Sequence, residues 1–177
     1  MNPRGPVTPA WKTALDSQFV AALDMLENAV RACPAQEWDD GSLPVAQRFW
    51  YLAYHTLFWL DCYLAERDEG FAPPPPYTLG ELDPAGVYPE RAYAPDELLH
   101  YLAHGRAKLG VALGTLTDAR AAERCGFATH DMSVLELHLY NLRHVQHHAA
   151  QLNLLLRQRT DSAPRWVGRG GLGPGGS

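Results

Sequence analysis

The clearest regularity in the chain is the return of apolar residues at three- and four-residue steps, which places side chains on one face of an α-helix. In the first such stretch these positions are Leu15, Phe19, Ala22, Leu23, Leu26 and Val30. Charged residues fall between them, and Pro34 ends the pattern. We therefore predict an amphipathic helix that begins near residues 8–10, with Thr8 as its cap and Pro9 in its first turn.

A second helix is predicted from Ser42 to about Arg67. Ser42 offers a capping hydroxyl, and Pro44 suits a first helical turn. The sequence that follows, VAQRFWYLAYHTLFWLDCYLAER, is apolar almost all the way round a helical projection. A helix of this kind packs on several sides, and we expect this one also to face another subunit.

The stretch 68–94 interrupts the helical pattern. It contains four consecutive prolines at 73–76, and further on Pro84, Gly86 and Pro89. This density of helix breakers predicts one long connection that is stiffened by polyproline geometry. A connection of this length in a compact domain usually carries a function or covers part of the structure.

Two more helices follow the connection. Pro95 precedes two acidic residues and starts a third helix that ends within 117–122. Its apolar stripe consists of Leu98, Leu102, Leu109, Leu113 and Leu116. Ser133 caps a fourth helix, because Glu136 three residues later completes a capping box, and this helix continues to about Arg159.

Four long helices with two short connections and one long one predict an all-α fold. The expected architecture is an antiparallel four-helix bundle with a long proline-rich connection between the second and third helices. We expect an irregular N-terminal arm over residues 1–9, one bundle domain over 10–160 and a flexible glycine-rich tail over 161–177. A chain of 177 residues that is 46% hydrophobic is long enough for one domain with a substantial core.

Composition narrows the classes of partner. A net charge of -5, with no concentrated basic face, gives no electrostatic reason to expect nucleic acid. Three widely spaced cysteines form neither a disulfide framework nor a metal knuckle, so we expect a reducing, cytoplasmic setting. The N-terminus lacks the apolar core of a signal peptide, and no stretch approaches the roughly 20 apolar residues that span a bilayer. We expect a soluble protein without a membrane partner.

The candidate chemistry begins with His144 and His148 in the fourth helix. A four-residue spacing brings two imidazoles within reach of one point, and the helical projection turns this pair inward. His55, mid-way along the second helix, is a third inward histidine. Three neutral imidazoles would hold a metal ion and leave positions open to water or substrate, as in a catalytic site. The alternative is that these histidines are core-edge residues hydrogen-bonded to backbone or water.

The remaining histidines are alternatives to this set. His100 and His104 have the same four-residue spacing, but they lie opposite the leucine stripe of the third helix, so we expect them to face solvent. His138 is too far along the fourth helix to share one ion with the inward pair. His147 lies on the flank of that helix, and His130, in the preceding linker, has no assignment.

Residues near the three histidines in the helical projection are expected to surround the metal. Asn141 and Gln151 lie near the ligand face and are the expected hydrogen-bond partners of the ligands. Tyr51, Trp59 and Cys62 are expected to line the approach. The alternative for the two aromatic residues is a packing role in the core, and for Cys62 an inert buried thiol.

The stretch RHVQHHAAQLNLLLR resembles the last helix of the DinB-like (DinB/YfiT-like) proteins, in which His-x-x-x-His is followed by a residue pair and then Gln-Leu. The matching residues are His144, His148, Gln151 and Leu152. Ala149 and Ala150 replace the usual Arg-Gly, a departure that concerns the subfamily. The family's histidine on the second helix, before an aromatic-rich segment, matches His55 in YLAYHTLFWLDCYL. The resemblance covers roughly residues 10–160.

This resemblance implies an up-down-down-up bundle, a homodimer and a divalent metal held by the three histidines. We expect Zn²⁺ or Ni²⁺, with Fe²⁺ or Mn²⁺ as alternatives. The function expected is that of a metal-dependent enzyme, resembling an S-transferase of low-molecular-weight thiols or a hydrolase, that acts on a small-molecule substrate. The alternative is a non-catalytic helical dimer that binds a metal or a small ligand.

Overall fold

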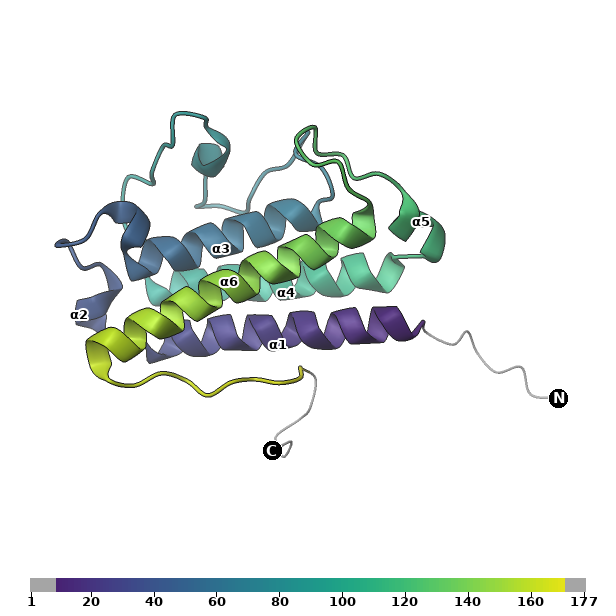
Figure 1. Cartoon of the computed structure of the whole chain (residues 1–177). Helices are drawn as coiled ribbons and strands as arrows, with labels where there is room; N and C mark the ends of the chain where they lie inside the picture. The colour runs from purple at the N-terminus through teal and green to yellow at the C-terminus, as the bar shows by residue number, and fades with distance from the viewer. Residues whose placement is uncertain (1–8, 171–177) are drawn as a thin grey trace.

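The computed structural model describes residues 9–170 of the chain. Its elements are α1 (Ala10–Ala32), α2 (Ala35–Trp38), η1 (Val45–Gln47), α3 (Phe49–Leu64), η2 (Leu79–Leu82), α4 (Pro95–Thr115), α5 (Asp118–Ala122) and α6 (Val134–Thr160). The long helices α1, α3, α4 and α6 pack together (Figure 1), and no strand is assigned among the described residues. The predicted all-α four-helix bundle is confirmed.

The four helices pack so that α1 and α3 each contact both α4 and α6. Helices α1 and α6 run in one direction and α3 and α4 in the other (Figure 1). The contacts agree, because Asn141 of α6 bonds to Leu60 of α3, whereas His144, further along α6, lies beside His55, earlier in α3. This is the up-down-down-up order that the resemblance implied. The parallel pair α3 and α4 requires the long connection of residues 65–94, which crosses back over the bundle (Figure 1).

Two predicted helix starts are confirmed by their caps. The Ser133 hydroxyl accepts the N–H of Glu136 at 3.2 Å, and the Glu136 carboxylate accepts the N–H of Ser133 at 2.9 Å. Pro95 is the first residue of α4, and Glu97 accepts the N–H of Ala94 at 2.8 Å. These signals succeeded because each involves only residues close in sequence. The N-terminal cap expected at Thr8 lies outside the described residues, and Pro9 occupies the cap position of α1.

The predicted start of the second helix at Ser42 is wrong. Residues 45–47 form the 3₁₀ turn η1, and α3 begins only at Phe49, after Arg48 in an extended conformation. The cause is tertiary: Arg48 donates to the carbonyl of Leu43 at 3.0 Å and to the carboxylate of Asp39 at 2.9 Å. These bonds favour an extended backbone at Arg48 over continuation of a helix through it.

Helix α4 ends at Thr115, slightly before the predicted range, and a short separate helix follows. The Thr117 hydroxyl accepts the N–H of Arg120 at 3.2 Å and so caps α5. The short helix α2 was not predicted. Its Trp38 is buried and donates to the carbonyl of Tyr93 at 2.8 Å, which joins the end of α1 to the start of α4.

Helix α3 is buried on nearly all sides within the chain itself. Helices α4 and α6 cover two faces, and aromatic residues of the connection cover another. Phe58 packs on Phe71 with ring centroids 5.5 Å apart, and Tyr54 packs on Tyr77 at 5.9 Å. Most of the apolar circumference of this helix is therefore covered by the chain itself.

Residues 161–170, the described part of the expected flexible tail, run back along α1 (Figure 1). Gly170 donates its N–H to the carbonyl of Ser17 at 2.9 Å, and Gln18 donates to the carbonyl of Gly168 at 3.2 Å. Residues 1–8 and 171–177 lie outside the described range. None of the helices between residues 9 and 170 combines the length and apolar character needed to cross a bilayer.

Candidate metal centre

Helix α6 carries the first two histidines of the candidate centre. The four-residue step from His144 to His148 puts their ring centroids 4.5 Å apart on one side of the helix. Val145, Ala149 and Leu152 are fully buried and fix that side against the bundle. The two imidazoles therefore face inward, as the helical projection predicted.

His55 reaches the pair from α3. Its ring centroid lies 5.3 Å from that of His144 and 4.9 Å from that of His148. One ligand nitrogen from each of the three histidines lies within 4.8 Å of the others, and all three residues are partly buried. The structure thus brings together the three residues that the sequence singled out.

The spacing of the nitrogens fits a metal ion. The Nε2 atoms of His55 and His144 are 3.4 Å apart. Two nitrogen ligands bound at about 2.05 Å to a tetrahedral ion lie about 3.3 Å from each other. The donor set is also suitable, since imidazole nitrogens suit Zn²⁺, Ni²⁺, Cu²⁺ and Fe²⁺. His55, His144 and His148 could therefore hold one such ion.

Two of the three rings are oriented by partners at their other nitrogen. The Nδ1 of His55 lies 2.7 Å from Oε2 of Glu81, and the Nδ1 of His148 lies 2.6 Å from Oε1 of Gln151. Both oxygens are acceptors, so each Nδ1 carries the hydrogen and each Nε2 keeps a lone pair. Gln151 therefore contacts one of the three histidines. The Nδ1 of His144 is buried and has no hydrogen-bond partner among residues 9–170.

Burial favours the neutral form of the α6 pair. Desolvation, and then the nearby His148 and His55, lower the pKa of His144 to about 3. Desolvation also lowers the pKa of His148 to about 4, although the bond to Gln151 acts in the opposite direction. Both imidazoles are neutral at pH 7, which is the form that binds a metal.

Glu81 is the residue of the centre that the sequence did not reveal. It lies in η2 of the α3–α4 connection, and besides His55 it accepts bonds from the Tyr51 hydroxyl at 2.6 Å and the Trp59 indole at 3.2 Å. Burial acts to raise the pKa of this carboxyl, but its hydrogen bonds, chiefly that of His55, bring the pKa below its usual value. The only local hint was an acidic residue between Leu79 and Leu82 in a loop.

An open pocket of about 340 Å³ gives access to two of the three histidines, His55 and His148. It is lined by Ala46, Tyr51, Leu52, His55, Gly80, Glu81, Gly86, Val87 and His148. Apolar and aromatic side chains form most of its wall, and no lysine or arginine lines it. The pocket therefore combines imidazole nitrogens that could bind a metal with space for a small molecule.

Two of the predicted neighbours, Asn141 and Cys62, lie outside the open pocket. Asn141 is fully buried and donates to the carbonyl of Leu60 at 3.0 Å, which joins α6 to α3. Cys62 is also fully buried, and burial raises the pKa of its thiol to about 12. Trp59 does not line the open pocket either, but it bonds to Glu81 and packs edge-on against His55, with ring centroids 6.4 Å apart.

The other histidines do not join the cluster, although the ring of His147 packs on that of His148 with centroids 5.0 Å apart. His100 and His104 are exposed, as expected, and His147 is exposed on the flank of α6. His138 is fully buried, with its Nε2 3.5 Å from Oε1 of Glu66. Among the residues that the structure describes, the cluster of His55, His144 and His148 is the only one with three potential metal ligands this close together.

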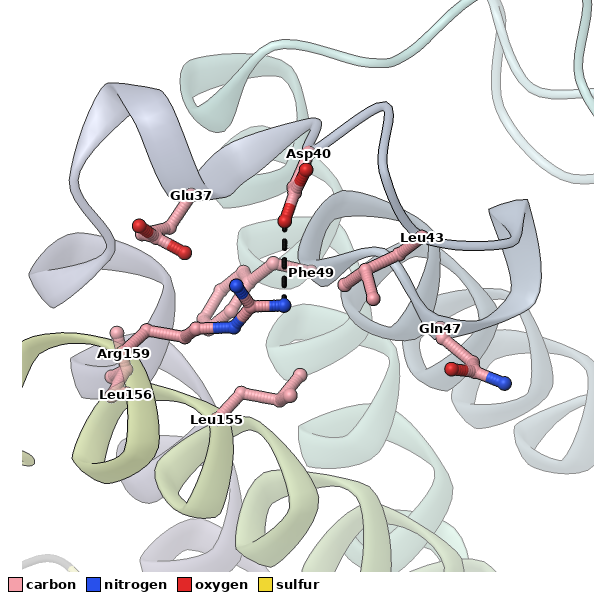
Figure 2. A pocket seen from close by; sticks show the side chains of 8 residues that line it. All are labelled: Glu37, Asp40, Leu43, Gln47, Phe49, Leu155, Leu156 and Arg159. Atoms are coloured by element: carbon pink, nitrogen blue, oxygen red, sulfur yellow. Dashed lines mark ion pairs between the residues drawn. The ribbon is translucent and has the colours of Figure 1, made fainter.

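A smaller hollow lies where α6 ends (Figure 2). It is lined by Glu37, Asp40, Leu43, Gln47, Phe49, Leu155, Leu156 and Arg159. Arg159 and Asp40 form an ion pair across it at 3.4 Å, which Figure 2 marks. None of the residues that line this hollow is a histidine or cysteine, whereas the three-histidine cluster offers potential metal ligands.

The fold and the site together define a class. A four-helix bundle with metal-ligating side chains converging from facing helices is an architecture that builds metal centres in its core. The family model of the DinB superfamily matches residues 18–152, and the chain belongs to that superfamily. No curated protein and no solved structure matches the chain at a significant level.

Proposed function

We propose that the protein is a metal-dependent enzyme in which His55, His144 and His148 hold one divalent ion, Zn²⁺ or Ni²⁺, with Fe²⁺ or Mn²⁺ as alternatives. One observation carries the proposal: three histidine nitrogens from two facing helices converge within 4.8 Å of one another. Two of these histidines also line an open pocket. A site with three protein ligands leaves a position for water or substrate, which is the arrangement of catalytic rather than structural zinc.

A bound ion of this kind lowers the pKa of a coordinated water or thiol and so supplies a nucleophile at neutral pH. The chain's own residues prepare the site. Glu81 and Gln151 orient two of the rings by accepting their Nδ1 hydrogens. Leu52 and Val87 give the pocket apolar wall on which a small substrate can rest.

The proposed reaction is transfer of a low-molecular-weight thiol or hydrolysis of a small molecule. Membership of the DinB superfamily and the resemblance of the last helix to its DinB-like members support this class. We propose a homodimer for the same reason, and a cytoplasmic location because the three widely spaced cysteines form no disulfide framework. The exposed apolar residues Leu139, Tyr140 and Leu154 on one helix, α6, are compatible with a subunit interface there.

The decisive measurement is elemental analysis of protein purified without a histidine tag. We expect about one divalent ion per chain in the unchanged protein. The ion should be lost from the His55→Ala, His144→Ala and His148→Ala variants. His147→Ala is the matched control, because this histidine is exposed on the same helix. The His147→Ala variant should keep the bound ion. Metal that survives all three ligand changes would overturn the proposal.

Catalysis needs a separate assay on metal-loaded protein. We expect thiol transfer to an electrophilic acceptor, or hydrolysis of an activated ester, that disappears with chelation and returns with the ion. Full metal occupancy without any such activity would favour the alternative, a non-catalytic metal-binding dimer.

A further inference from the structure

Glu81 approaches the three-histidine cluster from outside the helices that form it. It lies near the middle of the α3–α4 connection, 26 residues after His55, and its side chain is only 5% exposed. Among residues 9–170, no lysine or arginine lies within ion-pair distance of this carboxylate. A buried carboxylate without a cationic neighbour depends on its hydrogen bonds.

Those hydrogen bonds come from one face of α3. Tyr51, His55 and Trp59 follow one another at four-residue steps and therefore lie on the same side of the helix. The Tyr51 hydroxyl donates to Oε1, whereas the rings of His55 and Trp59 meet Oε2. Three turns of one helix thus present three donors to a single carboxylate. His55 is the central one.

The backbone conformation of segment 79–88 places this carboxylate against α3. A Cβ on Gly80 would lie 2.8 Å from the carbonyl oxygen of Val87, so the two sides of the segment can approach this closely only with glycine at position 80. Gly86 has a positive φ of 68° and donates its N–H to the carbonyl of Asp83 at 2.9 Å. Tyr88 then packs edge-on against Tyr51, with ring centroids 5.0 Å apart.

We propose that Glu81 is a positioning residue of the metal centre, and that it couples metal binding to the docking of segment 79–88 on α3. The proposal rests on the metal site proposed above. By holding the Nδ1 hydrogen of His55, the carboxylate fixes the ring with Nε2 directed toward His144, 3.4 Å away. A carboxylate in this position also makes the imidazole a stronger metal ligand.

The coupling acts in both directions. If the docked segment 79–88 improves metal binding through His55, bound metal must stabilise the docked segment by the same free energy. The same segment supplies Gly80, Gly86 and Val87 to the pocket wall. Metal binding would therefore also complete the pocket in which a substrate is held.

The first test compares Zn²⁺ affinities, measured by competition with a chelator. Glu81→Gln keeps the size of the side chain but removes the charge and one acceptor oxygen, and Glu81→Asp keeps the charge but withdraws it from His55. We expect both variants to lose 10- to 100-fold in affinity, the usual range for such partners. Glu90→Gln is the control, since it removes an exposed carboxylate from the same connection and should leave the affinity unchanged.

The second test measures hydrogen exchange of segment 79–88 with and without Zn²⁺. We expect Zn²⁺ to slow exchange in the unchanged protein and in Glu90→Gln, but not in Glu81→Gln at equal metal occupancy. A Co²⁺-loaded sample gives an independent readout, because its absorption spectrum should change in Glu81→Gln and not in Glu90→Gln. A residue that only anchored the connection would leave that spectrum unaltered.

The outcomes separate this proposal from the one it rests on. If the unchanged protein binds no Zn²⁺, the metal site itself is wrong. If it binds Zn²⁺ and Glu81→Gln binds equally well, only the role of Glu81 is wrong. Should Glu81→Gln fail to fold, the exchange measurement on the unchanged protein still decides, since absence of Zn²⁺ protection over 79–88 would contradict the coupling.

Discussion

Two histidine pairs in this molecule have the same four-residue spacing and entirely different surroundings. His144 and His148 on α6 are partly buried, and across the bundle they meet the ring of His55. His100 and His104 on α4 are exposed. The Nε2 of His104 lies 3.4 Å from Oδ1 of Asp61, but that carboxylate is already engaged.

The difference shows what spacing leaves undecided. Asp61 is only 1% exposed, accepts from Lys108 at 2.5 Å and from the Tyr101 hydroxyl at 3.1 Å, and so forms a satisfied ion pair between α3 and α4. His104 lies at the rim of that pair. In the α6 pair the facing atoms are imidazole nitrogens that still have lone pairs to share. A metal site needs a third ligand and partial shelter from water, and only the α6 pair has both.

The largest expected contrast is in metal binding by paired variants. Replacing His144 and His148 together with alanine should lower Zn²⁺ affinity by at least about 1,000-fold, or ~4 kcal/mol, because one ligand remains. The double replacement of His100 and His104 should leave it unchanged. Isothermal calorimetry or a chelator competition would measure both. Equal losses of Zn²⁺ affinity in the two double variants would show that the α6 and α4 pairs do not differ in metal binding.

The next contrast concerns the role of the α4 region in folding. Lys108→Met leaves the Asp61 carboxylate buried without its cation, and we expect it to lower the free energy of unfolding by about 3 kcal/mol. His104→Ala removes only an exposed neighbour of the same carboxylate and should change stability by less than about 0.5 kcal/mol. Urea unfolding checks both values. Neither variant should alter the Zn²⁺ affinity of the folded protein.

The pH dependence of stability offers a smaller contrast. The pKa values of His144 and His148 lie at about 3 and about 4 in the folded, metal-free protein, below their ordinary value of 6.5. Between these values and 6.5 the unfolded chain binds more protons, so stability falls as the pH falls through this window. Each histidine should cost on the order of 2 kcal/mol at pH 5 relative to pH 8.

Urea unfolding in a chelator at pH 8 and pH 5 would test this dependence. Replacing His144 and His148 with asparagine should make the acid loss smaller. The same replacement at His100 and His104 supplies the comparison, and an equal reduction there would show that burial of the α6 pair is not the cause.

The smallest contrast isolates the orientation of one ring. Gln151→Ala removes the acceptor at Nδ1 of His148, and we expect Zn²⁺ affinity to fall about tenfold, which is ~1.4 kcal/mol. Gln146→Ala is the matched control, because this glutamine of the same helix points to the sulfur of Met25 on α1. A tenfold loss in both variants would point to a general effect on α6.

Much of the fold could be predicted because its determinants are local. The apolar steps of α1, the proline and glutamate at the start of α4 and the capping box of α6 each involve residues within one or two turns. The start of α3 could not be predicted in this way. It is displaced to Phe49 by hydrogen bonds from Arg48 to Asp39 and Leu43, which are formed only when that loop packs.

The candidate site, like the fold, has features that the sequence predicts and features that depend on tertiary contacts. Helical periodicity places His144, His148 and Gln151 on one side of one helix and turns His55 inward on another. The resemblance to DinB-like proteins matches these three histidines, so the sequence by itself determined the candidate ligand set. The tertiary structure alone decided that their nitrogens meet within 4.8 Å, that His100 and His104 have no such partner and that Glu81 lies against His55. The physical reason is that helical spacing is repeated along the chain and can be read there. The contact between His55 and Glu81, 26 residues apart, depends instead on how the connection that begins after Leu64 folds back over the bundle.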